Sequence, residues 1–405
     1  MARQNRATVA EMKAKHPTAT HAPNFQPDIS TPQMILSKDQ VAKEIKSFKK
    51  GTAPGPSGLR GEHLKEAIKS TPPNRIDKAT AAITNLVNCM GAGKVPGEVA
   101  PYLCGARLHA AKKNDGGIRP IAVGEIFRRL TSKGFSHAMS DRAAAILSPC
   151  QLGVGVRGGC EAIAHTVRQV VDDGVGDPDL HILQVDLVNA YNMADRLTTF
   201  REMEKLFPDC LSWVLTCYGE EAELVFGNTV INSSVGFHQG DPLASLLFSV
   251  NLQPIIETIT TEVPGLKVNA WYLDDGTLAD LQKAVDIILR EGPARGLHLS
   301  TANTVLPPLL PKSTVWSPYD ISDSDDPLDR GIPRVMDPGI VLLGSPIGDL
   351  QFTQEWIKRK VAKVKDITDH LPYLQDAHVE FVLLRSCLSL PKVMFILRTT
   401  YPTNN

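Results

Sequence analysis

Short apolar runs alternate with polar, Gly- and Pro-containing segments along this chain, and their periods predict both strands and helices. One run, 268–272, alternates apolar and polar positions and leads to the adjacent acids Asp274 and Asp275. Gly276 follows at once, and a second strand-like run begins after it. Because Asp-Gly is a strong tight-turn signal, this stretch predicts a β-hairpin with both acids at its tip. The plain alternative is an ordinary hairpin turn, where Asp and Gly occur for steric reasons alone.

A second strand that ends in an acid and a distinctive helix start lie upstream of this hairpin. Residues 181–185 form a β-rich run that ends at Asp186. The sequence Gln-Gly-Asp-Pro at 239–242 then opens an apolar helix over 243–250, with Pro in the first turn, where it is tolerated. Asp241 is expected only to cap that helix. The chain therefore carries, in order, a strand ending in an acid, Gln-Gly-Asp-Pro and Tyr-x-Asp-Asp.

This ordered set of three motifs resembles the palm of a reverse transcriptase, and its finer wording is similar to the enzymes of non-LTR (LINE-type) retrotransposons. The resemblance runs from about Ser37 to the C-terminus. It implies an α+β fold, namely a right-hand polymerase with an antiparallel palm sheet, helical fingers and a partial thumb. The expected division is a flexible leader over 1–36, fingers with palm-border helices over 37–180, the palm with its catalytic motifs over 181–350, and the start of a thumb over 351–405.

Nucleotidyl transfer needs a nucleophilic 3′-hydroxyl and a neutralised pyrophosphate, and two Mg²⁺ ions about 4 Å apart serve both needs. Adjacent carboxylates repel one another unless such a cation offsets their charge. Asp186, Asp274 and Asp275 are the natural catalytic and metal-binding trio if their strands converge. The resemblance adds the backbone carbonyl of Leu187 as a ligand, with Mn²⁺ as an alternative metal. The plain alternative is a chance structural Asp at the end of each strand.

Tyr191, five residues after Asp186, is the main indication of which nucleotide is used. Viral RNA-dependent RNA polymerases generally carry an acid there, which recognises the ribose 2′-hydroxyl. An aromatic ring at this position resembles the steric gate that excludes that hydroxyl, so we expect deoxynucleotides; the alternative is a Tyr packed in the core. By the same resemblance, Gln239 lies by the nascent base pair, and Gly240 lets template and nucleotide approach the backbone.

A cationic hairpin is predicted over 106–123, with two strands around an Asn-Asp-Gly-Gly turn. Its basic residues suit an anionic ligand, although a solvated charged turn is the plain alternative. In reverse transcriptases such a hairpin folds over the incoming nucleotide, and its cations hold the triphosphate. By this resemblance Arg119 is the first candidate, since its planar fork matches phosphate oxygens, and Lys112 or Lys113 is the second.

Three features further downstream extend the resemblance. Lys312 is a candidate general acid for the leaving pyrophosphate, with a solvated Lys equally expected, and a small insertion over 301–311 weakens its alignment. The run 341–348 resembles the primer-grip hairpin. The basic helix 356–366 fits a thumb that contacts the duplex backbone, where affinity is independent of sequence and sensitive to salt; a merely solvated charged face is the alternative.

Composition changes this interpretation only slightly. The chain has 405 residues, 42% of them hydrophobic, which allows a large core. Its formal net charge of −1 counts mildly against a nucleic-acid enzyme, although a local basic groove matters more than the total. Seven scattered cysteines without a CxxC pair argue against a disulfide framework and against structural zinc. No apolar run is long enough to span a membrane, so we expect an intracellular protein, nuclear if its host is eukaryotic.

One further motif, Gly-x-Gly-x-x-Gly at 153–158, matches a dinucleotide-binding fingerprint in letters only. That fingerprint should follow a strand, whereas helix-like sequence precedes this one. Its glycines are expected instead to let the backbone approach the template strand.

Together these features predict an RNA-directed DNA polymerase of retroelement type, which extends a DNA primer on an RNA template with deoxynucleoside triphosphates (dNTPs) and magnesium. One rival is a decayed or domesticated relic that binds nucleic acid without catalysis, favoured by Leu187-Val188 in place of the more typical aromatic–Lys pair. An RNA-dependent RNA polymerase is a weaker rival, since it would usually read Gly-Asp-Asp at the hairpin and lack Tyr191.

Overall fold

The computed structural model describes residues 1–2, 4–19, 24–28, 31–69, 73–113, 116–279, 282–302, 312–319, 328 and 330–401. The chain divides into two compact units that are interleaved along the sequence. Unit 1 comprises Met1–Ser148, Leu187–Glu257 and Leu289–His298, and unit 2 comprises Pro149–Asp186, Thr258–Ile288 and Leu299–Asn405. The assignment of fingers, palm and thumb stays a prediction.

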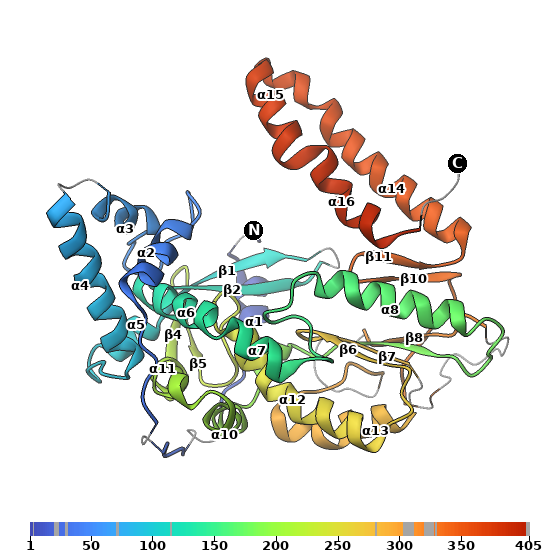
Figure 1. The fold of residues 1–405 in the computed structure, drawn as a ribbon, viewed down its shortest axis with the longest axis horizontal. Helices are drawn as coiled ribbons and strands as arrows, with labels where there is room; N and C mark the ends of the chain where they lie inside the picture. Colours follow the sequence, from blue (N-terminus) through green and yellow to red (C-terminus); the bar gives the residue numbers. More distant parts are fainter. Residues whose placement is uncertain are drawn as a thin grey trace. The chain divides into compact units, whose positions relative to one another are not determined.

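Helices and strands are interspersed along the whole chain, so the fold is mixed α/β (Figure 1). No helix among the described residues is long and apolar enough to cross a membrane. The α-helices are α1 (Arg6–Ala14), α2 (Lys38–Ser47), α3 (Gly61–Ala67), α4 (Pro73–Gly91), α5 (Ala100–Cys104), α6 (Ile126–Ala138), α7 (Ser140–Leu147), α8 (Gly159–Asp173), α9 (Ala190–Met193), α10 (Arg196–Leu206), α11 (Pro208–Tyr218), α12 (Ala244–Glu262), α13 (Gln282–Glu291), α14 (Leu350–Asp369), α15 (Ala377–Leu383) and α16 (Leu390–Thr399). The strands are β1 (Ala106–Lys112), β2 (Ile118–Gly124), β3 (Ile182–Val185), β4 (Ala222–Phe226), β5 (Thr229–Ser233), β6 (Val268–Tyr272), β7 (Asp275–Ala279), β8 (Thr314–Trp316), β9 (Arg334–Val335), β10 (Gly339–Leu342) and β11 (Ser345–Gly348).

Unit 1 contains a four-stranded sheet with the order β2-β1-β4-β5. The predicted cationic hairpin is confirmed as β1 and β2, which pair antiparallel from Ala106–Gly124 to Lys112–Ile118. Its turn residues 114–115 lie outside the described residues. β1 also pairs in parallel with β4, so the hairpin extends a larger sheet and does not stand alone.

The expectation that residues 1–36 form a flexible leader is wrong for the first part of that segment. Helix α1 forms there, and its Met12 is fully buried against the apolar residues of β1, β2, β4 and β5. Glu11 Oε1 also accepts a hydrogen bond from Ile118 N (2.9 Å). A nine-residue helix with so few buried positions shows no sustained period in the sequence, which is why the pattern missed it.

Two helix predictions have different outcomes. The capping box at the start of α2 is confirmed, with Gln40 N donating to Ser37 Oγ (3.2 Å) and Ser37 N to Gln40 Oε1 (2.8 Å). The single helix expected over 124–147 is instead two helices, α6 and α7, that meet at Met139. Met139 N still donates a hydrogen bond to Phe135 O (3.0 Å). The boundary between the two helices therefore has no Pro or Gly that the sequence pattern would have recognised as a helix end.

Unit 2 contains a five-stranded sheet with the order β6-β7-β3-β8-β9. Every pair in it is antiparallel except β8–β9. Helix α8 packs on one face, where Ile163 and Val167 contact a core that includes Ile182 and Val268 (Figure 1). A mostly antiparallel sheet backed by a helix is therefore present, and its identity as a polymerase palm stays a prediction.

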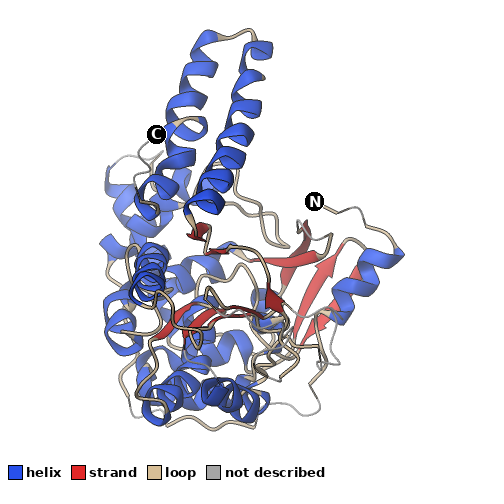
Figure 2. Ribbon diagram, turned by 90° about the vertical axis from the view of Figure 1, so that its right-hand side faces the viewer, coloured by secondary structure: helices blue, strands red, loops and turns tan. Residues whose placement is uncertain are grey.

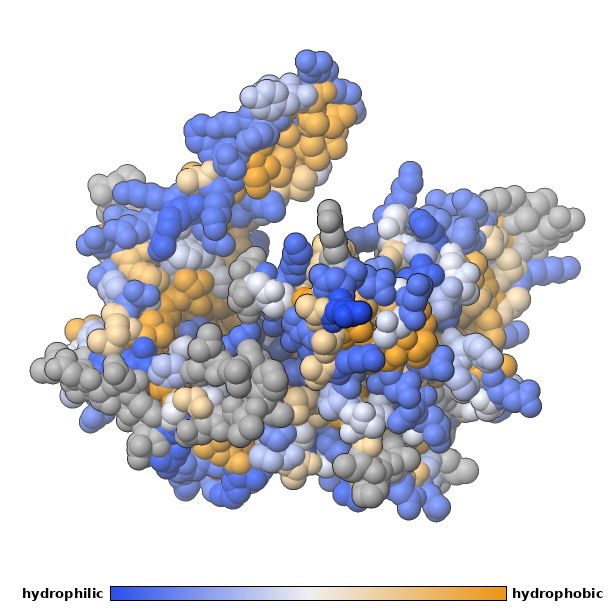
Figure 3. Space-filling model, turned by 180° about the vertical axis from the view of Figure 1, so that it is seen from behind, coloured by the Kyte–Doolittle hydropathy of each residue, from blue (hydrophilic) through white to orange (hydrophobic). Residues whose placement is uncertain are grey.

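The predicted hairpin at 341–348 is confirmed as β10–β11, with Leu343 and Gly344 forming its two-residue turn. Next, α14, α15 and α16 form a helical hairpin (Figure 2). The basic helix expected at 356–366 is thus part of the longer α14. Figure 3 shows apolar side chains along one side of this helical hairpin. Exposed apolar residues over 350–399 are Leu350, Val361, Ile367, Tyr373, Leu374, Val379, Phe381, Val382, Leu390 and Leu397.

Candidate active site

Strand pairing in unit 2 brings the predicted catalytic acids to one end of the sheet. The last antiparallel pair between β3 and β7 is Val185–Gly276. Asp186 follows Val185 and Asp275 precedes Gly276, so these two acids are cross-strand neighbours. Directly opposite residues have Cβ atoms about 4.5–5.5 Å apart. Asp186 and Asp274 are half-buried and Asp275 is exposed, so the acids face solvent at the end of a packed sheet.

The acids sit one position away from where the turn signal predicts. Tyr272 pairs with Asp275, so the two-residue turn is Leu273-Asp274, and Asp275 and Gly276 belong to strand β7. Gly276 is required there for packing, because a Cβ would lie 2.5 Å from the Trp271 ring. The prediction of an Asp-Gly turn is therefore wrong, although the hairpin itself is confirmed. Only Asp274 occupies the turn.

The turn has an unusual backbone. Leu273 has φ +60°, in the left-handed region that non-glycine residues seldom occupy. For an L-residue this conformation costs roughly 1–2 kcal/mol. Such strain persists only where surrounding contacts hold it, and it occurs often at functional sites.

Two serines fix the backbone of Asp186. Ser313 Oγ accepts from Asp186 N and donates to Asp186 O, both at 3.1 Å, and Ser300 N donates to the same carbonyl oxygen at 2.9 Å. Ser313 is fully buried and Ser300 nearly so. The peptide groups on both sides of Asp186 are thus held before any ligand binds. The sequence carried no signal for this role, since a single Ser has no distinguishing pattern.

Lys312 lies on the other side of Asp186 from Asp275. β8 pairs with β3 at Gln184–Thr314, and extending that register by two residues places Lys312 opposite Asp186. Lys312 is half-buried, and its backbone N donates to Ser300 Oγ (3.0 Å). The role of Lys312 as a general acid stays a prediction. The insertion predicted at 301–311 falls largely outside the described residues.

The donor set at this end of the sheet suits magnesium. Among the described residues, no group of three or more His, Cys, Asp or Glu side chains is gathered closely enough to hold a metal ion unaided. Magnesium, however, is usually held by one or two carboxylates together with substrate phosphates, not by a cage of protein ligands alone. Asp186 and Asp275 as cross-strand neighbours, with Asp274 beside them, meet that smaller requirement. The carbonyl of Leu187 as a ligand stays a prediction.

In unit 1, the structure brings Tyr191 and the Gln-Gly-Asp-Pro segment together. Phe237 N donates to Tyr191 O (2.7 Å), which ties the segment to α9. The Tyr191 ring stacks on Phe248 of α12 with centroids 4.9 Å apart, and its Oη lies 3.3 Å from Ser245 Oγ. The ring is half-buried. One face is thus packed while part of the ring remains accessible, which is compatible with a steric gate; that role stays a prediction.

The structure explains why residue 240 must be glycine, and the explanation differs from the one that the resemblance implies. It has φ +123°, and a Cβ there would lie 2.5 Å from Ala122 O of β2. Ala122 N in turn donates to Gln239 O (2.7 Å). The close approach that requires glycine is therefore between this loop and β2. Roles for Gln239 and Gly240 next to a nucleotide stay predictions.

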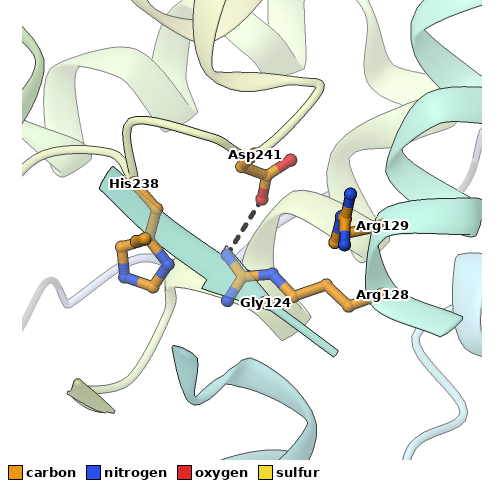
Figure 4. Close-up of a pocket in the computed structure, with 6 residues that line it drawn as sticks. Gly124, Arg128, Arg129, His238 and Asp241 are labelled. Carbon is orange, nitrogen blue, oxygen red and sulfur yellow. Dashed lines mark hydrogen bonds and ion pairs between the residues drawn. The ribbon is translucent and has the colours of Figure 1, made fainter. Parts of the chain in front are cut away.

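A shallow pocket in unit 1 surrounds a buried ion pair (Figure 4). Asp241 Oδ2 accepts from Arg128 and from Tyr218 Oη, both at 2.9 Å, and Asp241 Oδ1 accepts from Leu243 N. Burial, together with the nearby positive charge of Arg128 and then Arg196, lowers the pKa of His238 well below its usual value. The bonded Leu243 lies just before α12 (Ala244–Glu262), so the expected bond from Asp241 into the first turn of the helix is not seen among the described residues, and Asp241 instead neutralises Arg128. These contacts indicate a structural site.

Arg196 was not singled out from the sequence. It is buried, and its guanidinium donates to Gly236 O (3.0 Å), Ser233 O (3.0 Å) and Tyr218 O (3.1 Å). It therefore fixes the loop that leads into Gln239. A lone Arg within an amphipathic helix is usually a solvated residue, so no sequence pattern distinguished it.

The basic residues of the β1–β2 hairpin lie on two different faces. Alternation along β1 places Lys112 on the same face as Ala110 and Leu108, which α1 covers. Arg119 pairs with Ala111 and is exposed on the opposite face, where the next residue in alternation is Lys113. The structure thus favours Lys113 over Lys112 as the companion of Arg119. Binding of a triphosphate by either stays a prediction.

The five cations of α14 are all exposed. Lys360 Nζ lies 4.9 Å from the centroid of the Trp356 ring, and Lys365 forms an ion pair with Asp369 (2.6 Å). The helix thus offers a charged surface, as either interpretation of its sequence requires. The five exposed cations of α14 are Lys358, Arg359, Lys360, Lys363 and Lys365.

Solved structures include chains similar to this one. One of them is the structure of telomerase from Candida albicans in complex with the TWJ fragment of telomeric RNA. The TM-score is 0.44 at 10% sequence identity, and the match covers 64% of this chain and 46% of the telomerase chain. This chain therefore spans less than half the length of the structure it matches. A scan against protein-family models and a search of curated proteins both found no match.

Proposed function

We propose that this protein is an RNA-directed DNA polymerase of retroelement type, which extends a primer 3′-end with dNTPs on an RNA template. The observation that carries the proposal is the register of β3 against β7. It makes neighbours of Asp186 and Asp275, which lie 89 positions apart in the sequence, and adds Asp274 from the turn between β6 and β7. The order of the three motifs that supply these elements supports the same function.

Each residue then has a stated task. Asp186 and Asp274 would hold Mg²⁺, or Mn²⁺ in its place, with Asp275 on the primer side. Bound metal would neutralise the charge that develops on the phosphates and would activate the 3′-hydroxyl. Lys312 donates a proton to the leaving pyrophosphate. The chain's remaining contribution is to position its acids, since phosphoryl transfer leaves little covalent work to the protein.

The nucleotide and the nucleic acid would contact other residues. In unit 1, Arg119 and Lys113 bind the triphosphate, and Tyr191 excludes the ribose 2′-hydroxyl. In unit 2, the cations of α14 contact phosphates of the template–primer duplex. Because these contacts neutralise phosphate charge, affinity for nucleic acid falls as salt concentration rises.

A specific observation also favours a second candidate, a relic that binds nucleic acid without catalysis. Leu187 and Val188 are 5% and 2% exposed, so both are core residues. They leave no cation where the resembled family usually has one next to the first acid. The experiment below separates the two functions.

The test is primer extension on an RNA template with Mg²⁺ and either dNTPs or ribonucleotides. The Asp274→Ala variant should lose about 100- to 1,000-fold in rate, the usual effect of removing one stabilising group from a charged transition state. Asp141→Ala, which removes an exposed acid from α7, is the matched control and should extend normally. Salt-sensitive RNA binding without extension would instead establish the relic, and a preference for ribonucleotides would refute the role of Tyr191.

A further inference from the structure

The turn that carries Asp274 requires external support. Leu273 precedes Asp274 and has a positive φ, yet it lacks both the freedom of glycine and a polar side chain that could bond to its own backbone. The β10–β11 turn also begins with a leucine of positive φ, Leu343 (φ +48°), but Gly344 follows it there, whereas Asp274 follows Leu273. A contact from elsewhere in unit 2 must therefore hold Leu273 in place.

Gln151 makes that contact with both ends of its amide group. Gln151 Oε1 accepts from Leu273 N (2.8 Å), and Gln151 Nε2 donates to Leu273 O (3.0 Å). Oε1 also accepts from Gly153 N (3.0 Å). The side chain is fully buried, so water does not compete for these hydrogen bonds. One side chain thus fixes both peptide groups that flank Leu273, and with them its φ and ψ.

The segment that carries Gln151 is itself held along β6. Trp271 N donates to Cys150 O and Leu152 N donates to Trp271 O, both at 2.7 Å. Gly153 lies so close that a Cβ would be 2.6 Å from Leu273 N. The expectation that this glycine lets the backbone approach the template is therefore replaced by a contact within the protein.

We infer that Gln151 is a positioning residue for Asp274. The Leu273 carbonyl belongs to the peptide group that begins Asp274, so the hydrogen bond from Nε2 sets the direction in which Asp274 leaves the turn. The inference rests on the proposed function, because Asp274 matters only if it holds metal and phosphate. Gln151 itself touches no substrate.

The test separates positioning from a general loss of packing. Gln151→Met keeps the length of the side chain and removes all three hydrogen bonds. Gln253→Met is the matched control, since Gln253 is also buried but bonds only Glu257 of its own helix α12 (3.0 Å). In single-turnover extension, Gln151→Met should slow the chemical step about 100-fold, the effect of misplacing a reacting group by about 1 Å. Primer–template affinity and dNTP affinity should stay within about twofold of wild type.

A second variant covers the case in which Gln151→Met fails to fold. In Gln151→Glu, an ionised carboxylate still accepts from Leu273 N but cannot donate to Leu273 O. Once protonated, it can do both, and burial favours the protonated form. The rate of this variant relative to wild type should therefore rise as pH falls. A variant that extends as fast as wild type at a pH where its carboxylate is ionised would contradict a positioning role.

Each outcome decides the inference. Equal rates for Gln151→Met and wild type overturn it while leaving the polymerase intact. If wild type extends no primer, the proposed function fails by itself. In that case the positioning role of Gln151 is tested by Mn²⁺ affinity, measured by electron paramagnetic resonance. Weaker Mn²⁺ binding in Gln151→Met than in Gln253→Met upholds it, and equal binding, or none in any variant, rejects it.

Discussion

Removing the hydroxyl of Ser313 should destabilise the protein, because that hydroxyl holds the backbone of the first acid. Ser313→Ala deletes both 3.1 Å hydrogen bonds to Asp186. The carbonyl oxygen of Asp186 keeps its bond from Ser300 N, whereas Asp186 N loses the acceptor that the structure provides. A hydrogen bond contributes about 0.5–1.5 kcal/mol net, so the loss of both costs about 1–3 kcal/mol. The free energy of unfolding should fall by that amount.

A second buried serine gives the matched control. Ser249 is 0% exposed, as Ser313 is, but its Oγ makes no hydrogen bond. Ser249→Ala should thus leave stability unchanged or raise it slightly. Urea unfolding followed by tryptophan fluorescence is a suitable assay, since Trp213 lies in unit 1 with Ser249, and Trp271, Trp316 and Trp356 lie in unit 2 with Ser313. If both variants lose the same stability, the contact with Asp186 contributes nothing and the reasoning fails.

Three further outcomes are expected. Tyr191→Ala should raise ribonucleotide use relative to dNTP use in primer extension, whereas Tyr191→Phe, which keeps the ring, should not; unchanged selectivity in the Ala variant would contradict the gate. Asp241→Asn should lower the free energy of unfolding by about 3–5 kcal/mol, because it leaves the buried guanidinium of Arg128 without its charge partner; denaturant melts measure it. The depressed pKa of His238 keeps that ring neutral in the folded protein. As pH falls below about 6.5, His238 therefore gains a proton in the unfolded protein but not in the folded one. Stability should be full above that pH and decline below it, and His238→Gln should flatten the part of the pH–stability curve that this residue contributes.

The elements that carry the acids could be predicted because their local signals agree with the final pairing. Apolar alternation ends at Asp186 and again before Asp274, and in each case a strand ends within one or two residues of the acid. Motif order then implied that these strands meet. The structure adds the register that makes Asp186 and Asp275 neighbours.

Other features could not be predicted, because long-range contacts decide them. Gly276 carries a strong local turn signal, yet pairing with Val185 and the indole of Trp271 place it inside a strand. Leu273 in turn adopts a conformation that its own side chain disfavours, because Gln151 holds it from 122 positions away. Local turn and strand propensities do not predict such long-range contacts.

The tie between Ser300 and Ser313 bears on how this protein tolerates change. Ser313 N donates to Ser300 O (3.1 Å), and Lys312 N donates to Ser300 Oγ (3.0 Å), so the two ends of the connecting segment are fastened to each other. Once loop ends are fastened, doubling the length between them costs only about 0.6 kcal/mol. Changes in the length of the chain between Ser300 and Ser313 should therefore leave the backbone of Asp186 in place.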